Sequence, residues 1–461
     1  MRLVILSNRE PLQQRDDGGW AVSLGGLTTA LVPVLEKRGG VWIAWGEKGV
    51  REVPRLRVPE DDPVFEVIRM ELSEEEVSNF YYGLANRVLW PLCHYFIEQM
   101  DLQRQFYRDY CQVNWRFAQA AADAFQEGDL TWVQDYQLML VPGLLRKARP
   151  EARIGYFHHI PWPAVEVWRT LPWATDLVEG LLGADLIGFH DDTYARNFLD
   201  AARDLAGAEV HGHLLQWNGR EIRVEPFPIG IDTARFSELA SAPKVHYEAK
   251  RIRQDAASDF VVIGVDRLDY TKGVLERLLA FEQFLKDHPE YQGRVSFYQI
   301  AAPSRTRVDS YQELKRSVDE VAGRINGLHM RDNWVPVRYL YRSLPQEELA
   351  AFYVAADAAL ITPLRDGMNV VAQEFAWTTD RGMLILSNLT GAAQVLDKAL
   401  LVNPYDIEGV ARTLRLVLDM TEDERRERMT PVREQVAQLD VHLWADRFLR
   451  TLEDGSHIGG L

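Results

Sequence analysis

The sequence has few cysteines, no long hydrophobic run and no excess of basic residues, and each absence excludes a class of protein. Only two of its 461 residues are cysteines, Cys93 and Cys111, too few for a disulfide framework and without the spacing of a zinc site. No segment reaches the roughly 18 consecutive apolar residues that a membrane-spanning helix needs. The 52 Lys and Arg residues are outnumbered by 68 Asp and Glu, a net charge of -16. This charge argues against general binding to nucleic acid or to an anionic membrane.

The composition that remains is typical of a soluble globular protein. Hydrophobic residues make up 47% and charged residues 26%, which excludes a largely disordered chain. The start, MRLVILSNREP, is a short apolar run followed by polar residues, unlike a signal peptide. We therefore expect a cytoplasmic protein that binds small molecules, neither nucleic acid nor membrane. A phosphorylated ligand would need a few locally placed Arg and Lys residues.

Short runs rich in Val and Ile alternate with longer amphipathic stretches, a pattern that predicts an α/β fold with parallel sheets covered by helices. The alternation restarts after residue 245, so we expect two doubly wound, Rossmann-like domains with a ligand-binding cleft between the carboxyl ends of their sheets. The expected strands are 3–7, 41–45, 130–134, 153–159 and 185–190, followed by 259–268, 294–302, 335–341, 358–362 and 382–387.

The junction between the domains is expected near 236–245. Prolines and changes of pattern mark EPFPIGIDTARF at 225–236, and SAPK follows at 241–244. We therefore predict one domain over 1–240 and a second over 241–461 that ends in helices.

Neither a G-x-G-x-x-G fingerprint nor a Walker-type Gly-Lys-Ser/Thr sequence is present, so a nucleotide phosphate would need another kind of site. The strongest candidate is VDRLDYTKG at 265–273, where Arg267 ends an expected strand and Lys272 precedes a helix. Two cations beside a helix N-terminus suit a diphosphate. A solvated surface loop is an equally good interpretation of this fragment taken alone.

Two further fragments have the chemistry of a nucleotide site. In TPLRDGMNVVAQEF at 362–375, amides at a helix start suit phosphate oxygens, and Glu374 suits the two hydroxyls of a ribose. A plain helix cap with a solvent-facing Glu is the alternative. In SLGGLTTAL at 23–31, the glycine pair lets a phosphoryl group approach backbone amides, although a tight turn is the simpler interpretation.

Arginines and aromatics near expected strand ends suit a sugar phosphate. Rings pack on the C–H faces of a sugar and a guanidinium binds the phosphate. Taken singly, each aromatic is more often a core residue. The residues concerned are Arg9, Trp45, Tyr81, Trp90 and Arg305.

Asp135 in WVQDYQL and His159 in YFHHIPWP also end expected strands. Polar side chains at the carboxyl ends of parallel strands can face a ligand. A lone His at such a position is more often structural than catalytic.

Taken together, these motifs resemble the retaining trehalose-6-phosphate synthases, which are GT-B glycosyltransferases of family 20. The resemblance covers nearly the whole chain. It includes, in order, SNR at 7–9, SLGGL, NRVLWP, WVQDYQL, FHHIPWP, PIGID, DRLDYTKG, APSR, GRING, PLRDGMNVVAQEF and VNPYD at 402–406.

The resemblance implies transfer of glucose from a nucleoside-diphosphate glucose, with UDP-glucose expected, to glucose 6-phosphate with retention. It implies no metal or other cofactor, and it leaves homo-oligomerisation open. The implied donor-binding residues are Gly25, Gly26, Arg267, Lys272, Leu344, Asp366, Gly367, Met368, Asn369, Val370, Val371 and Glu374. The implied acceptor-binding residues are Arg9, Trp45, Tyr81, Trp90, Asp135 and Arg305. The implied catalytic residues are Arg267, Lys272, Asp135, His159 and Asp366.

The chain departs from the family in two motifs near these residues. Gln134 and Gln137 stand where family members commonly have His, and VVAQEF at 370–375, which includes Gln373, stands where they commonly have LVAKEY. The opening SNREP also resembles glucosylglycerol-phosphate synthases, which use glycerol 3-phosphate. Such an enzyme, a pseudo-glycosyltransferase that joins cyclitols and a non-catalytic sugar-phosphate sensor are the alternatives.

Overall fold

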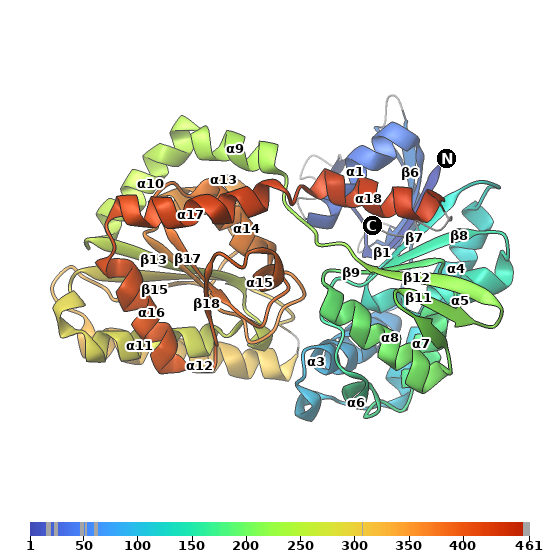
Figure 1. Ribbon diagram of the computed structural model, residues 1–461, viewed down its shortest axis with the longest axis horizontal. Coiled ribbons are helices and arrows are strands. Elements are labelled where there is room, and N and C mark those ends of the chain that lie inside the picture. The colour runs from blue at the N-terminus through green and yellow to red at the C-terminus, as the bar shows by residue number, and fades with distance from the viewer. Residues whose placement is uncertain are drawn as a thin grey trace. The chain divides into compact units, whose positions relative to one another are not determined.

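The computed structural model describes residues 1–14, 20–22, 26–46, 50, 53–59, 63–306 and 308–454. The chain forms two compact units, unit 1 with Met1–Pro228 and Val441–Leu461, and unit 2 with Ile229–Asp440. The strands predicted from the sequence all form, as β1, β4, β7, β8 and β9 in unit 1 and β13 to β17 in unit 2 (Figure 1).

The division differs from the predicted boundary at 240. The chain enters unit 2 after Pro228, because α9 (Thr233–Ser241) packs on α14 (Val370–Thr378) within that unit. It returns to unit 1 after Asp440, a second crossing that the prediction lacked. Near the crossings, the Ile231 amide donates to the Leu439 carbonyl at 3.1 Å. A Cβ on Gly230 would lie 1.5 Å from that same oxygen, so glycine is required there.

The sheet of unit 1 has a parallel centre and antiparallel edges. Its order is β10-β11-β12-β9-β8-β7-β1-β4-β6-β5, and pairing is parallel from β12 through β6. The antiparallel edge strands β5, β10 and β11 were not predicted from the sequence. The strands are β1 (Leu3–Arg9), β4 (Gly40–Trp45), β5 (Arg55–Val58), β6 (Phe65–Met70), β7 (Leu130–Gln134), β8 (Arg153–Phe157), β9 (Leu186–Phe189), β10 (Glu209–His211), β11 (Leu214–Trp217) and β12 (Arg220–Pro226), with β2 (Leu12–Gln14) and β3 (Trp20–Val22) paired separately.

The C-terminal helix explains why the end of the chain belongs to unit 1. The Phe448 ring of α18 (Val441–Asp454) stacks on Trp132 of β7 at 4.3 Å between centroids, and α18 packs beside α1 (Gly26–Arg38) in Figure 1. The sheet leaves room for the Phe448 ring at Gly155 and Gly188, where a Cβ would lie 2.7 and 2.8 Å from it. The other helices are α2 (Glu74–Glu76), η1 (Val77–Leu89), α3 (Trp90–Cys93), η2 (Ile97–Gln99), α4 (Arg104–Ala124), η3 (Tyr136–Leu138), α5 (Val141–Ala148), α6 (Val165–Trp168), α7 (Ala174–Leu181) and α8 (Asp192–Ala206).

Unit 2 has an entirely parallel sheet of order β15-β14-β13-β16-β17-β18. Helices α10, α13, α14 and α17 cover one face, and α11, α12 and α16 cover the other (Figure 1). The strands are β13 (Phe260–Arg267), β14 (Val295–Ala302), β15 (Val337–Leu340), β16 (Ala358–Ile361), β17 (Met383–Ser387) and β18 (Leu400–Val402). The helices besides α9 and α14 are α10 (Pro243–Ala256), η4 (Tyr270–Lys272), α11 (Val274–Asp287), η5 (Pro289–Tyr291), α12 (Asp309–His329), α13 (Gln346–Ala355), α15 (Ala392–Val395), α16 (Ile407–Asp419) and α17 (Glu422–Ala437).

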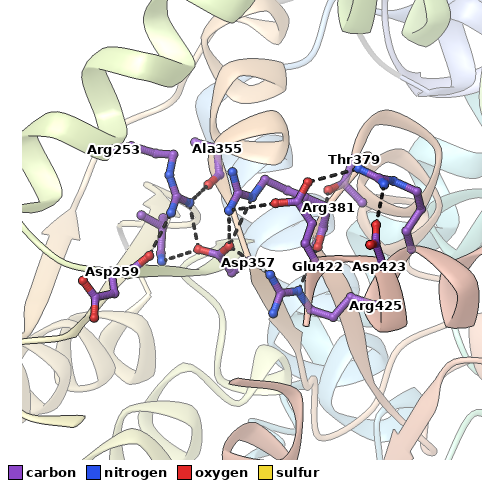
Figure 2. A network of polar contacts seen from close by, with 12 residues as sticks. Arg253, Asp259, Ala355, Asp357, Thr379, Arg381, Glu422, Asp423 and Arg425 are labelled. Carbon is purple, nitrogen blue, oxygen red and sulfur yellow. Dashed lines mark hydrogen bonds and ion pairs between the residues drawn. The ribbon is translucent and has the colours of Figure 1, made fainter. Parts of the chain in front are cut away.

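A buried carboxylate ties the helices of unit 2 to the amino end of its sheet (Figure 2). Asp357 precedes β16 and is 1% exposed. It accepts hydrogen bonds from Arg253 at 2.7 Å, from Arg381 at 2.9 Å and from the Val261 amide at 2.9 Å, and Arg425 lies 3.4 Å away. Three cations around one buried anion make this cluster structural, at the end of the sheet opposite the predicted ligand site.

Candidate functional site

The two predicted diphosphate-binding cations lie at the carboxyl end of β13. Arg267 is the last residue of the strand and is exposed, and Lys272 ends the short turn η4. Gly273 then begins α11 with φ of 62°, where a Cβ would lie 2.5 Å from the Thr362 carbonyl oxygen. The structure therefore places both cations beside the N-terminus of a 14-residue helix, as predicted.

Asp366 and Asn369 complete a polar cluster with Lys272. The Lys272 Nζ lies 2.5 Å from Asp366 Oδ2, and Asn369 Nδ2 donates to the same oxygen at 3.0 Å. Asn369 has φ of 76° and caps α14 by accepting from the Ala372 amide at 3.2 Å. The α14 N-terminus is thereby held next to the cations, and Gly367 and Met368 lie in the same buried turn.

Glu374 lies on the second turn of α14. Tyr353 of α13 donates a hydrogen bond to its Oε2 at 2.9 Å. Burial raises the pKa of Glu374 to about 7, against the opposing effect of the Tyr353 hydrogen bond. Near neutral pH this carboxylate is partly protonated. Hydrogen bonds donated by a ligand would favour its ionised form and lower its pKa.

The remaining predicted donor residues have less distinctive surroundings. Val370 and Val371 begin α14 and are half-buried, and Leu344 is half-buried in the loop before α13. Gly26 begins α1 in unit 1, and Gly25 lies outside the described residues. The structure gives these residues no further test.

Arg305 follows β14 in unit 2, near the predicted donor cluster. Its side chain is 6% exposed and its Nη1 lies 2.8 Å from Asp269 Oδ2. The other predicted acceptor residues belong to unit 1.

In unit 1, Asp135 and His159 meet at the carboxyl ends of β7 and β8. Asp135 has φ of 69° and ψ of 172°, a backbone region that essentially only glycine adopts. The His159 amide donates to its Oδ1 at 3.0 Å. Gln134 Oε1 lies 2.9 Å from His159 Nε2. Gln134 thus contacts the ring of His159 from the position where family members have His.

His159 is a neutral group near neutral pH. Burial, together with nearby His190 and His158, lowers the pKa of His159 well below its ordinary value. Its imidazole can therefore exchange hydrogen bonds with a sugar but does not supply a positive charge.

Two of the three predicted acceptor aromatics, Trp45 and Tyr81, lie beside Arg9 at the end of β1. The Arg9 guanidinium lies 5.7 Å from the Trp45 centroid and 5.3 Å from that of Tyr81. Tyr81 lies on η1, a helix of the π type, a form that occurs frequently at functional sites. Trp90 is 4% exposed and packs on His94 at 4.1 Å, so its visible role is in the core, and its ligand contact stays a prediction.

Several residues that organise these clusters were not identified from the sequence. Tyr353 and Tyr311 lie on helices, where a tyrosine cannot be told from a core residue. Gln373 donates to the Ile229 carbonyl at 3.0 Å, so it holds α14 to the start of unit 2. Asp269 had a usable signal, because an Asp two residues before a Thr in a short turn is a typical cap.

Within the described residues, no cluster of three or more His, Cys, Asp or Glu could hold a metal ion. No helix in the same part of the chain is both long and apolar enough to span a bilayer.

The chain is similar to known proteins over nearly its full length. The model of glycosyltransferase family 20 matches residues 1–454. A trehalose-6-phosphate synthase of Mycobacterium avium is 42% identical over 472 residues, covering 98% of this chain and 95% of the relative. A bifunctional trehalose-6-phosphate synthase/phosphatase of Thermoproteus tenax is also 42% identical over 98% of this chain, which spans only 63% of that relative.

Solved structures share the fold over nearly the full length. The E. coli trehalose-6-phosphate protein bound with UDP-2-fluoro glucose has a TM-score of 0.91 at 33% identity, with 98% of this chain and 99% of that one covered. A trehalose-phosphate synthase of Burkholderia xenovorans in complex with glucose-6-phosphate has a TM-score of 0.89 at 34% identity, with 98% and 100% covered. The predicted GT-B fold class is confirmed, and the chain belongs to glycosyltransferase family 20.

Proposed function

We propose that this protein transfers glucose from a nucleoside-diphosphate glucose, UDP-glucose being the expected donor, to the anomeric hydroxyl of glucose 6-phosphate. The product is α,α-trehalose 6-phosphate, and the configuration of the donor carbon is retained. The proposal assigns the donor site to unit 2 and most of the acceptor residues to unit 1.

The observation that carries the proposal is the polar cluster at the carboxyl edge of unit 2. Lys272 forms an ion pair with Asp366 in the turn before α14, and Arg267 lies at the end of β13. A diphosphate suits these cations and the two helix N-termini. Glu374, on the second turn of α14, suits the ribose of the same nucleotide. The E. coli neighbour with its bound UDP-2-fluoro glucose supports this assignment.

The chemistry follows from the charge that develops on the leaving group. As the bond from glucose to the diphosphate breaks, negative charge grows on the phosphate oxygens, and Arg267 and Lys272 stabilise it. One such contact lowers the barrier by about 3 to 4 kcal/mol. We propose that these cations act without a metal ion, and that the departing phosphate takes the proton of the acceptor hydroxyl on the face where it leaves. A structural neighbour described in terms of glycosyl transfer with retention supports this stereochemistry.

The acceptor residues of unit 1 suit a sugar phosphate. Arg9 provides a guanidinium beside the rings of Trp45 and Tyr81, the combination that binds a phosphate next to a sugar face. His159 is neutral and is held by Gln134, and it suits a sugar hydroxyl. The Burkholderia xenovorans neighbour with bound glucose-6-phosphate supports this class of acceptor.

The test is a matrix of donors and acceptors. UDP-, ADP- and GDP-glucose are each offered with glucose 6-phosphate or with glycerol 3-phosphate, in EDTA, and NMR identifies the linkage of the product. We expect α,α-trehalose 6-phosphate. If the product is glucosylglycerol phosphate, the protein is a glucosylglycerol-phosphate synthase. If the substrates bind but no product forms, the protein is a sensor. Activity that EDTA abolishes and Mg²⁺ restores would overturn the metal-independent step.

Two substitutions and their matched controls test the cations. Arg267→Ala and Lys272→Ala should each lower kcat by about a hundredfold or more while the protein stays folded. The controls Arg294→Ala and Lys244→Ala remove exposed cations of the same unit, which pair with Asp259 and Glu347. Turnover of the site variants equal to that of the controls would refute the assignment.

A further inference from the structure

The carboxylate of Asp269 lies between the two sets of predicted ligand-binding residues in unit 2. It is fully buried. Its Oδ1 accepts from the Thr271 amide at 3.1 Å and from Thr271 Oγ1 at 3.0 Å. Its Oδ2 accepts from Arg305 Nη1 and from the Tyr311 hydroxyl, both at 2.8 Å. One side chain therefore holds two different loops, one with each oxygen.

The Oδ1 contacts fix the turn that presents Lys272. Asp269 caps this turn, and the Lys272 amide donates to the Asp269 carbonyl at 2.9 Å. The Thr271 carbonyl in turn accepts from the amides of Leu364 and Arg365 at 2.8 and 3.3 Å. Leu364 and Arg365 directly precede Asp366, the partner of Lys272. These backbone hydrogen bonds therefore hold the Lys272 turn against the residues that lead into Asp366.

The Oδ2 contacts fix Arg305. The backbone of Arg305 has φ of 43°, in the left-handed region, which costs about 1 to 2 kcal/mol for a residue other than glycine. Its guanidinium contacts both Asp269 and the Tyr311 hydroxyl of α12. A guanidinium has five donors, so these contacts through Nη1 are compatible with a phosphate bound by the same group.

We infer that Asp269 and Tyr311 are positioning residues. Asp269 positions both Arg305 and the turn that carries Lys272, and Tyr311 positions Arg305 alone. The inference rests on the proposed function, in which Lys272 binds the donor diphosphate, and on the prediction that Arg305 binds the acceptor, glucose 6-phosphate. Neither positioning residue needs to touch a substrate.

The charge of Asp269 is permanent under assay conditions. Burial by itself would raise its pKa, but Arg305, Arg267 and Lys272 outweigh that effect and lower the pKa to about 2. A change of pH therefore cannot imitate the loss of this carboxylate, and substitution is the appropriate perturbation.

Two conservative substitutions separate the two sides of the carboxylate. Tyr311→Phe removes the hydroxyl on the Arg305 side. We expect it to raise KM for glucose 6-phosphate about tenfold, with kcat and the Kd of UDP-glucose within twofold of wild type. Thr271→Val removes the hydroxyl on the Lys272 side. We expect it to weaken UDP-glucose binding about tenfold, with KM for glucose 6-phosphate within twofold. Asp269→Asn should change both.

Tyr291→Phe is the matched control. Tyr291 also donates to a carboxylate of unit 2, Asp419, at 2.7 Å, and that pair joins η5 to α16. The control should leave both binding constants unchanged. Calorimetric titration with UDP-glucose and with glucose 6-phosphate provides the Kd values, and thermal melting confirms that each variant is folded.

The outcomes separate this inference from the proposed function. If Tyr311→Phe behaves like Tyr291→Phe, or if it weakens both ligands equally, the positioning role is overturned while product formation by the wild type upholds the function. If the wild type forms no trehalose 6-phosphate but binds both ligands, the function fails and the selective effects on Kd still decide the inference. If the wild type does not bind glucose 6-phosphate, both are refuted.

Discussion

Glu374 should release a proton when the donor binds. In the free protein burial raises its pKa to about 7, so at pH 6 about 0.9 of the molecules carry the proton. Ribose hydroxyls that donate to the carboxylate favour its ionised form and move its pKa back towards the ordinary value of 4.5. A full return to that value would leave about 0.03 proton on the bound state at pH 6, so binding would release up to about 0.9 proton.

The same shift makes donor affinity depend on pH. With a pKa of about 7 in the free protein and a full return to the ordinary 4.5 on binding, affinity should rise up to about sixtyfold between pH 5 and pH 7.5. UDP-glucose is the suitable ligand, because its diphosphate diester has no group that titrates in this range. Calorimetry at pH 6 in two buffers with different ionisation enthalpies measures the released protons directly.

Glu374→Gln separates this effect from all other titrations. Gln keeps an acceptor for the Tyr353 hydroxyl but has no proton to release. We expect its binding at pH 6 to release almost no protons and its donor affinity to be nearly independent of pH. Equal proton release by wild type and variant, or none by the wild type, would refute the ribose assignment of Glu374.

Unfolding provides an independent check on the pKa of Glu374. Between pH 4.5 and 7 the folded state binds more protons at this group than the unfolded state, so the free energy of unfolding falls as the pH rises. The loss approaches about 3 kcal/mol above pH 7. Glu374→Gln should therefore be more stable than wild type at pH 8 and lose that advantage near pH 4.5. An equal difference at both pH values would contradict the raised pKa.

Three further substitutions test the structure from other sides. Asp135→Gly and Asp135→Ala should both lose activity. Denaturant unfolding should show the glycine variant to be about 1 to 3 kcal/mol more stable than the alanine variant, because glycine adopts this backbone conformation without strain. Equal stabilities of the two variants would contradict the strain at Asp135. Asp357→Asn leaves the buried Arg425 and the half-buried Arg253 and Arg381 without their anion and should lower the free energy of unfolding by about 3 to 5 kcal/mol, with turnover per folded molecule unchanged. Unaltered stability would contradict the structural role of the cluster. Phe448→Ala removes the ring stacked on Trp132 and should lower the same free energy by about 3 to 5 kcal/mol, and a loss below 1 kcal/mol would mean that α18 is not packed there.

The fold could be predicted because its strands carry a strong local signal. In β7 all five residues, LTWVQ, are buried, as expected for a parallel strand covered on both faces. The return of the chain to unit 1 had no such signal. The amphipathic pattern of α18 shows that the helix has a buried face but not which sheet covers it. That choice depends on Gly155 and Gly188, far away in the sequence, which make space for Phe448.

The candidate site was predictable to a similar extent and for a similar reason. Arg267 and Asp135 were identified because a polar residue at the end of a buried strand is a local pattern. Their supports were not, because each depends on a contact between distant segments. Tyr311 reaches Asp269 across 42 positions, and Tyr353 reaches Glu374 across 21. A tyrosine on an amphipathic helix does not reveal the partner of its hydroxyl.

Backbone strain supplies information that the sequence lacked. Of the seven residues other than glycine with positive φ in the described part of the chain, three are predicted site residues, namely Asp135, Arg305 and Asn369. Others have local explanations, since Asn218 lies in the turn between β11 and β12 and Ala257 ends α10. Asp135 and Arg305 instead follow strands of the parallel sheets, and their side chains contact other loops, whereas Asn369 caps α14 and binds Asp366 of the same turn. A strained residue that a turn explains is part of the fold. One that follows a strand and is held by distant contacts is a candidate for a ligand site, because strain of about 1 to 3 kcal/mol persists only where the surroundings enforce it.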